Sequence, residues 1–254
     1  MSMFGKQRRI DRLDFILAGA QKSGTTALHY FLSKHRSITM GDQQEMHFFD
    51  NDEAFAGTVD YDLLHQHFRR VGRSTIAGEC TPSYLYWKPA AERIWQYNPK
   101  IKLLVLLRNP IDRAFAHWNM QRFKGREPLD FLEAVKEEKI RIAGAPPIEA
   151  RRFAYVDRGL YAQQLERFFK FFPREQVKVV KFENFQGQQR ETLDSIFSFL
   201  GLDPLASLRN RDRNVVPYER TMNWEEKIFL FNLFADDVAK LEQLLGWDCS
   251  DWKL

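Results

Sequence analysis

The sequence predicts an α/β protein with a central parallel sheet and helices on both of its faces. Short apolar runs rich in branched side chains alternate with stretches of helical periodicity, and each stretch is long enough to hold a crossover helix. A glycine-containing loop also stands between the first apolar run and the first helical stretch. This order of strand, loop and helix is typical of phosphate sites in α/β folds.

Four strands are predicted, and one of them is much stronger than the others. Ile101–Leu107 is apolar apart from Lys102, and the turns Asn98-Pro99 and Asn109-Pro110 flank it, so we expect it at the centre of the sheet. The run Ser74–Gly78 gives the weakest signal. In chain order the predicted strands are Asp14–Ala18, Ser74–Gly78, Ile101–Leu107 and Val177–Phe182.

The helical stretches follow the same order along the chain. They run from about Leu129 to a break at Ala143–Pro147, then over Leu160–Phe172, Glu191–Leu200 (ended by Gly201), and Trp224–Leu245 as one or two helices. Neither the break nor the polar segment Leu205–Val216 separates two self-sufficient cores. We therefore predict a single domain over residues 1–254, with residues 1–12 as a flexible N-terminal segment and functional loops at one end of the sheet.

The composition narrows the class of protein without naming a function. The chain has 254 residues, 44% of them hydrophobic, and a formal net charge of +4, which suits a nucleic-acid binder, a membrane-surface protein or an enzyme for anionic substrates. With only Cys80 and Cys249, we expect no disulfide framework or cysteine zinc site, and hence a reducing cytoplasm. Residues 1–12 are polar and basic with no apolar stretch behind them, so we expect neither a secretory signal nor a membrane anchor.

The loop after the first strand predicts a phosphate site of an unusual kind. Gly19 and Gly24 stand five positions apart, and Thr25 and Thr26 open a helix whose free N–H groups attract oxyanions. In the Walker A pattern the lysine follows the second glycine, whereas here Lys22 precedes it. The loop should therefore hold a phosphate without the usual ATPase arrangement.

The central strand ends in a cation. Arg108 directly follows Leu107, at a place where a Walker B strand would end in an acid that holds magnesium. A guanidinium suits a phosphate better, because it can grip two oxygens at once. The displaced lysine and this arginine together argue against magnesium-dependent ATP hydrolysis and favour a nucleotide with more than one separated phosphate.

At these residues the chain resembles a known family, the sulfotransferases that use 3'-phosphoadenosine 5'-phosphosulfate (PAPS). It is most similar to the heparan-sulfate type, which adds N- or 3-O-sulfate groups, and we expect a bacterial member. The resemblance spans nearly the whole chain. It rests on the Lys-x-Gly-Thr-Thr loop, the segment Gln44–Asp50, the segment Glu79–Tyr84, the Arg-Asn-Pro-x-Asp-Arg-Ala run from Arg108, Gly159–Tyr161 and Leu244–Asp248.

The resemblance implies how the donor is held. Lys22 would contact the oxygen that bridges phosphorus and sulfur, where charge builds as the sulfuryl group leaves, and Arg108 would hold the 3'-phosphate. The other donor-binding residues it implies are Ser23, Gly24, Thr25 and Thr26, with Arg211 and Arg213 closing over the nucleotide. The product is adenosine 3',5'-bisphosphate (PAP). A sulfuryl group carries less negative charge than a phosphoryl group, so no metal ion is expected.

The resemblance also implies the residues that act on the acceptor. Glu45 would take the proton of an acceptor hydroxyl or amine as it attacks sulfur in line, and His47 and Asp50 would orient the acceptor. His47 is the natural rival to Glu45 as base, since some sulfotransferases use a histidine.

Two positions depart from the family pattern. Ala116 stands where a serine usually provides a second ligand for the 3'-phosphate, and Cys80 stands where the heparan-sulfate enzymes have a lysine near base and acceptor. Because of the second departure, the class of acceptor stays open. A carbohydrate is the favoured acceptor, and a lipid, a polyketide or another small alcohol is the alternative.

Two other function classes stay open at this stage. A P-loop kinase or NTPase would turn over ATP with magnesium, and a noncatalytic basic protein would bind a polyanion in a salt-sensitive way. We favour the sulfotransferase and expect no nucleic-acid or membrane partner; the oligomeric state is not predicted.

Overall fold

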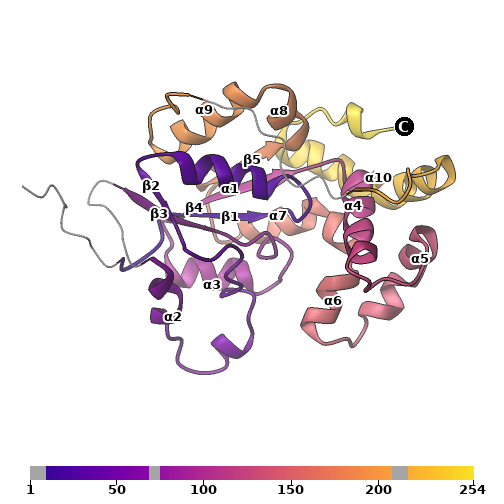
Figure 1. Ribbon diagram of the computed structural model, residues 1–254, viewed down its shortest axis with the longest axis horizontal. Coiled ribbons are helices and arrows are strands. Elements are labelled where there is room, and N and C mark those ends of the chain that lie inside the picture. Colours follow the sequence, from indigo (N-terminus) through magenta and orange to yellow (C-terminus); the bar gives the residue numbers. More distant parts are fainter. Residues whose placement is uncertain (1–9, 69–74, 208–216) are drawn as a thin grey trace, which may run out of the picture. The chain divides into compact units, whose positions relative to one another are not determined.

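A computed structural model describes residues 10–68, 75–207 and 217–254 (Figure 1). The chain divides into two compact units, each made of two chain segments. The first unit contains residues 1–107 and 166–213, and the second contains residues 108–165 and 214–254. The prediction of a single domain over residues 1–254 stays a prediction.

The first unit is built around a parallel five-stranded sheet. Its strands are β1 (Phe15–Gly19), β2 (Ile38–Met40), β3 (Ile76–Cys80), β4 (Lys102–Leu107) and β5 (Val177–Lys181), in the spatial order β2-β3-β1-β4-β5. Phe15 pairs with Gly78 of β3 on one side and with Lys102 of β4 on the other, so β1 is central, and the strand predicted at the centre, Ile101–Leu107, is its neighbour β4. The parallel α/β prediction is confirmed, and β2 is a strand that the prediction missed.

Helices cover both faces of this sheet, as predicted. Helices α1 (Thr25–Lys34), α8 (Phe182–Gly187) and α9 (Gln189–Leu200) lie on one face, and α3 (Ala90–Tyr97) lies on the other (Figure 1). Alternate residues of β1 point to opposite faces, and Phe15 and Leu17 join the apolar cluster under α1 and α9. Short helical segments complete the unit: η1 (Glu53–Phe55), α2 (Asp62–His65), η2 (Gln66–Phe68) and η4 (Arg174–Gln176).

The second unit is helical. It contains α4 (Pro110–Phe123), α5 (Phe131–Ile142), α6 (Pro147–Phe153), η3 (Asp157–Gly159), α10 (Trp224–Leu245) and η5 (Ser250–Trp252), and α7 (Tyr161–Phe169) runs from this unit into the first. The stretch Trp224–Leu245 is one helix, because Asn223 and Glu226 form a capping box at its start and Gly246 ends it with φ 66°.

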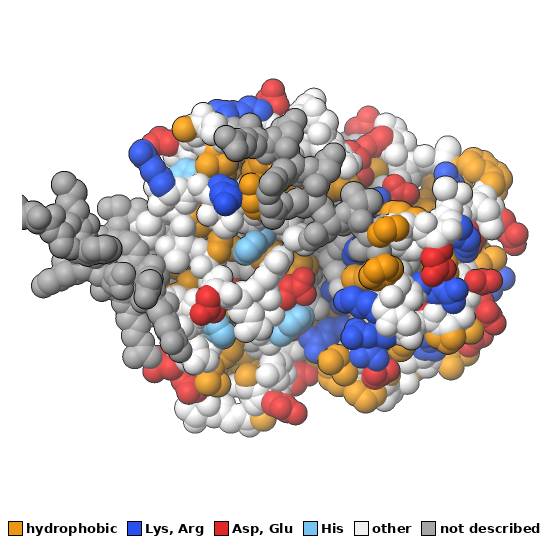
Figure 2. Space-filling view, in the orientation of Figure 1, with side chains coloured by type: hydrophobic (Ala, Val, Ile, Leu, Met, Phe, Trp, Pro, Cys, Tyr) orange, Lys and Arg blue, Asp and Glu red, His pale blue; other side chains and the backbone are white. Residues whose placement is uncertain are grey.

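Buried acids organise the interior of the second unit. Glu127 accepts hydrogen bonds from the Tyr155 hydroxyl at 2.6 Å and from Arg141 at 2.7 Å. Glu138, on α5, accepts the backbone N–H groups of Val156 and Asp157, which fixes the turn before η3. Charged side chains of both signs lie over α5 and α6 in Figure 2, and in these two helices Arg141 pairs with Glu127 and Arg152 with Glu149.

Among residues 10–68, 75–207 and 217–254, no helix combines the length and the apolar character needed to cross a lipid bilayer.

Candidate active site

The loop between β1 and α1 has the backbone of an anion site. Lys22 and Gly24 both have positive φ, 69° and 86°, so the chain reverses sharply before the helix begins at Thr25. A Cβ atom on Gly24 would lie 2.6 Å from the Phe182 ring, and one on Gly19 would lie 2.5 Å from Cβ of Leu85. Both glycines are therefore required by space, and Gly24 also by its conformation.

The same loop presents hydrogen-bond donors that the described protein leaves unused. The side chain of Ser23 is completely buried, and its hydroxyl oxygen has no partner among the described residues. Helix α1 begins at Thr25 without a side-chain cap and without an acid in its first turn, so its first N–H groups and its dipole remain uncompensated. These features fit a bound oxyanion, because a buried polar group without a partner destabilises the fold unless a ligand supplies one.

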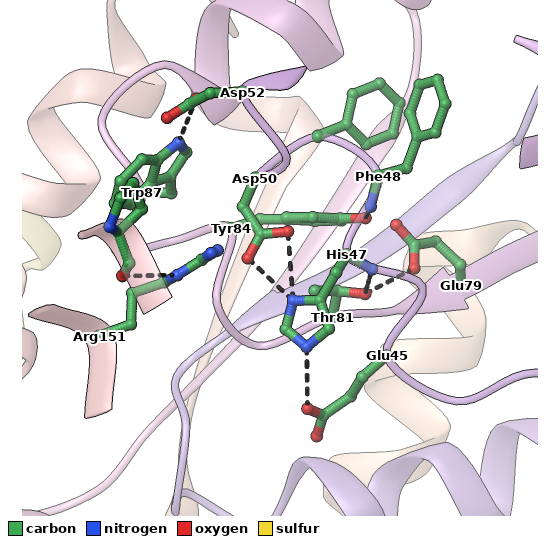
Figure 3. A network of polar contacts seen from close by, with 12 residues as sticks. Glu45, His47, Phe48, Asp50, Asp52, Glu79, Thr81, Tyr84, Trp87 and Arg151 are labelled. Carbon is green, nitrogen blue, oxygen red and sulfur yellow. Dashed lines mark hydrogen bonds and ion pairs between the residues drawn. The ribbon is translucent and has the colours of Figure 1, made fainter. Parts of the chain in front are cut away.

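The acidic cluster lies on the loop that follows β2. Figure 3 shows the imidazole of His47 between the carboxylates of Asp50 and Glu45. Nδ1 of His47 donates to Asp50 at 2.9 Å, and Nε2 forms an ion pair with Glu45 at 3.6 Å. The side chain of Asp50 is completely buried, whereas those of His47 and Glu45 are 48% and 44% exposed. Glu45 and His47 are therefore both accessible to an acceptor, whereas Asp50 is not.

This arrangement keeps His47 charged. Its hydrogen bonds to Asp50 and Glu45, in that order, raise the pKa of His47 to about 9 and outweigh the opposing effect of burial. At neutral pH the imidazole is a cation and cannot accept a proton.

The backbone of the loop is strained at its two reactive residues. Glu45 and His47 have φ of 59° and 53°, the left-handed region that costs a residue with a Cβ about 1–2 kcal/mol. Such a conformation persists only where the surroundings hold it. The Glu45 N–H donates to the carbonyl oxygen of Cys80 at 3.0 Å, which is the first of three contacts with the segment after β3.

Two hydroxyl groups make the other contacts. The N–H of His47 donates to Oγ1 of Thr81 at 3.4 Å, and the N–H of Phe48 donates to the Tyr84 hydroxyl at 3.1 Å. The Thr81 hydroxyl in turn donates to the buried carboxylate of Glu79 at 2.9 Å (Figure 3). These roles of Thr81 and Tyr84 could not be predicted from the sequence, because a hydroxyl that accepts a backbone N–H produces no pattern in sequence spacing.

The segment after β3 is also tied to β1. The N–H of Thr81 donates to the carbonyl of Leu17 at 3.2 Å, and that of Leu85 donates to the carbonyl of Ala18 at 2.8 Å. The phosphate loop begins directly after β1. One strand therefore fixes both the anion loop and the segment that holds the acidic cluster.

Of the three arginines predicted to bind the donor, one lies in the second unit and two lie outside the described residues. Arg108 follows the last residue of β4; its guanidinium lies 4.0 Å from Asp112, and its carbonyl oxygen accepts the Tyr161 hydroxyl at 2.9 Å. Arg211 and Arg213 lie outside the described residues.

The two positions that depart from the family pattern are both buried. Ala116 lies inside α4, and its neighbour His117 is buried against Tyr155 and Gln121. Cys80 belongs to the apolar cluster under α1, and burial raises the pKa of its thiol well above the usual range. It therefore supplies no charge where the resemblance would place a lysine.

Comparison with known proteins agrees with this geometry. The family model described as "Sulfotransferase domain" matches residues 12–217. The mouse heparan sulfate glucosamine 3-O-sulfotransferase 5 is 32% identical over 195 residues, which are 77% of this chain and 55% of that protein. The human bifunctional heparan sulfate N-deacetylase/N-sulfotransferase 2 is 25% identical over 232 residues, 88% of this chain and 25% of that protein. The chain thus spans about half or less of the length of these two relatives.

Solved structures give the same result over the full fold. A sulfotransferase from Alicyclobacillus acidocaldarius superposes with a TM-score of 0.81 at 32% identity, covering 96% of this chain and 99% of that one. The mouse sulfotransferase SULT7A1, solved in complex with PAP, shares the fold with a TM-score of 0.58 at 14% identity, covering 95% and 90% of the two chains. With the family model matching most of its length, this chain belongs to the sulfotransferase family.

Proposed function

We propose that this protein transfers a sulfuryl group from PAPS to an acceptor hydroxyl, or less favourably an amine, on a carbohydrate. The observation that carries the proposal is the tie between β1 and the segment Thr81–Leu85, which fixes the anion loop and the Glu45 cluster to one strand. An in-line transfer requires the donor site and the proton acceptor to be held in fixed positions relative to each other.

The donor side is assigned to the loop after β1. PAPS supplies an activated sulfuryl group whose departure leaves negative charge on a phosphate. Lys22 would neutralise that charge, while Ser23 and the N-terminal N–H groups of α1 would hold the phosphate oxygens. We assign the 3'-phosphate to Arg108, and a covering role to Arg211 and Arg213.

The base is assigned to Glu45 rather than to His47. Both side chains are about half-exposed, but His47 already carries a proton at neutral pH, which leaves the Glu45 carboxylate as the exposed group that can accept one. Asp50 is buried against His47, so we infer that Asp50 acts on the acceptor through the imidazole, which it orients.

The acceptor class is the least constrained part of the proposal. The named activities of the relatives favour an anionic carbohydrate. The neutral, buried Cys80 keeps a lipid, a polyketide or another small alcohol as alternatives. A cytoplasmic location, and the lack of nucleic-acid and membrane partners and of a metal, remain predictions.

Labelled donor tests the proposal against its rivals. The protein would be incubated with ³⁵S-labelled PAPS in three separate reactions, each with a different acceptor. The acceptors are a heparan-type polysaccharide, the same polysaccharide bearing free amines, and a long-chain alcohol. We expect label on the first polysaccharide, with or without EDTA. Magnesium-dependent ATP turnover without label transfer would favour the kinase or NTPase. Salt-sensitive polysaccharide binding with no effect of PAP would favour the noncatalytic protein.

A further inference from the structure

Glu79 is a deeply buried acid beside the candidate site, and the chemistry assigned above does not use it. It lies on β3 and is 1% exposed. One of its carboxylate oxygens accepts the Thr81 hydroxyl at 2.9 Å, and the other has no hydrogen-bond partner among the described residues. An acid at this depth is rarely present without a role, because burial disfavours its charge.

The two hydroxyls beside Glu79 connect it to the strained loop. Thr81 and Tyr84 both interact with the Glu79 carboxylate. The same hydroxyls accept two consecutive backbone N–H groups, those of His47 and Phe48. A hydroxyl has one proton to donate, so giving it to a carboxylate leaves the oxygen lone pairs free to accept a backbone N–H.

We propose that Glu79 is a positioning residue: through Thr81 and Tyr84 it holds the loop of Glu45 and His47 in the left-handed conformation that brings these two side chains together. A carboxylate does this better than an amide or a hydroxyl, since it can accept a hydrogen bond from each neighbouring hydroxyl and donates to neither. The catalytic meaning of the inference rests on the proposed function, while its structural core does not.

Glu79 is mainly a carboxylate above about pH 7, and the positioning role uses that form. Burial raises the pKa of Glu79 to about 7, and the nearby hydroxyls of Tyr84 and Thr81 oppose the rise. The titratable groups that interact with it from neighbouring elements are Asp50 and His47 on the loop, Cys80 and Tyr84 on its own segment, and Tyr97 on α3.

The sharpest variant is Thr81→Val, because it removes the linking hydroxyl while preserving shape and changing no charge. If the loop loosens, His47 leaves its two carboxylates, and the pKa of His47 should fall from about 9 towards 6.5. Glu79→Gln should cause the same fall, although part of it would come from the lost negative charge. Thr81→Ser keeps the hydroxyl and should restore the parent value.

The experiment is a histidine NMR titration of the full chain, with thermal unfolding recorded for each variant. Glu138→Gln is the matched control, since Glu138 is also a buried glutamate whose carboxylate accepts hydrogen bonds, but it lies in the second unit. It should lower stability without changing the pKa of His47.

Kinetics of sulfuryl transfer add the catalytic readout. We expect kcat to fall about tenfold or more in Thr81→Val with the donor KM unchanged, as for loss of positioning alone. Glu79→Gln should have little further effect in a Thr81→Val, Tyr84→Phe background, because its two routes to the loop are gone.

The two proposals fail separately. A folded Thr81→Val protein in which His47 still titrates near 9 would overturn the positioning role, and Tyr84→Phe gives the same test should Thr81→Val not fold. Absence of label transfer by the parent protein would overturn the proposed function and leave the titration result intact.

Discussion

The buried carboxylate of Asp50 holds Nδ1 of His47 at 2.9 Å, and this contact turns Nε2 toward Glu45. The result is a row of three charged groups in which Asp50 is buried and His47 and Glu45 are about half-exposed. A histidine held in this way serves as a cationic clamp on Glu45 and not as a base. This relationship leads to distinct expectations for each of the three side chains.

Removal of the Glu45 charge should stop transfer but not donor binding. Glu45→Gln keeps the shape of the side chain and loses the proton acceptor, so we expect kcat to fall by about 10²- to 10⁴-fold. Calorimetry with PAP should give the parent affinity. A Glu45→Gln enzyme with near-parent kcat would move the base role to His47 or elsewhere.

The pKa of His47 should depend on Asp50. In Asp50→Asn the strongest hydrogen bond that raises this pKa is weakened, so the value should drop from about 9 towards 6.5. NMR titration of the histidine ring measures it directly. An unchanged value would mean that Glu45 alone keeps the imidazole charged.

The raised pKa of His47 also determines how the stability of the fold should change with pH. Because the folded pKa of His47 lies above the unfolded value of 6.5, its contribution to stability is complete below about pH 6.5 and is lost as pH rises through about 9. Thermal unfolding of parent and Asp50→Asn across this range should show the loss in the parent and a smaller one in the variant. A parallel pair of curves would contradict the assignment.

Gly24 should tolerate no side chain. Gly24→Ala places a Cβ against the Phe182 ring in a left-handed backbone, and we expect a loss of at least about 1 kcal/mol in the free energy of unfolding, with weaker PAP binding. Gly57→Ala is the control, since a Cβ there meets nothing within 4 Å and its φ is not positive. Equal stability of the two variants in urea denaturation would refute the role of the turn.

Replacing Cys80 by the lysine of the heparan-sulfate enzymes should lower the stability of the fold. Cys80 lies in the apolar cluster under α1, so Cys80→Lys must bury an ammonium or displace its neighbours, and it should destabilise the fold by several kcal/mol, about the effective penalty for burying one ion. Cys80→Ala should cost less. Urea denaturation compares the two, and a Cys80→Lys protein as stable as the parent would show that the side chain can reach the acidic cluster instead.

Much of the fold could be predicted from the sequence because its main strands are apolar runs. Ile101–Leu107 and Val177–Phe182 were predicted close to β4 and β5, and Trp224–Leu245 coincides with α10. The strand β2 was missed, since three residues with one buried side chain give too short a pattern.

The candidate site also contains some features that the sequence predicts and others that it does not. The phosphate loop and the order of Glu45, His47 and Asp50 can be read from spacing, because these residues lie near one another in the chain. The burial of Asp50 and the support from Thr81 and Tyr84 could not, since they depend on contacts 34 and 36 residues apart in the chain. The charge state of His47 follows from this packing and not from its neighbours in sequence.

The most direct test of the account is a calorimetric titration with PAP of the parent protein, Lys22→Ala, Arg108→Ala and the control Lys34→Ala, whose lysine lies at the far end of α1. We predict saturable binding by the parent and the control, and a loss of about 10- to 100-fold in affinity in each of the other two, as expected for a lost charge-assisted hydrogen bond. No heat of binding to the parent, or equal affinity in all four proteins, would contradict the donor site and the function built on it.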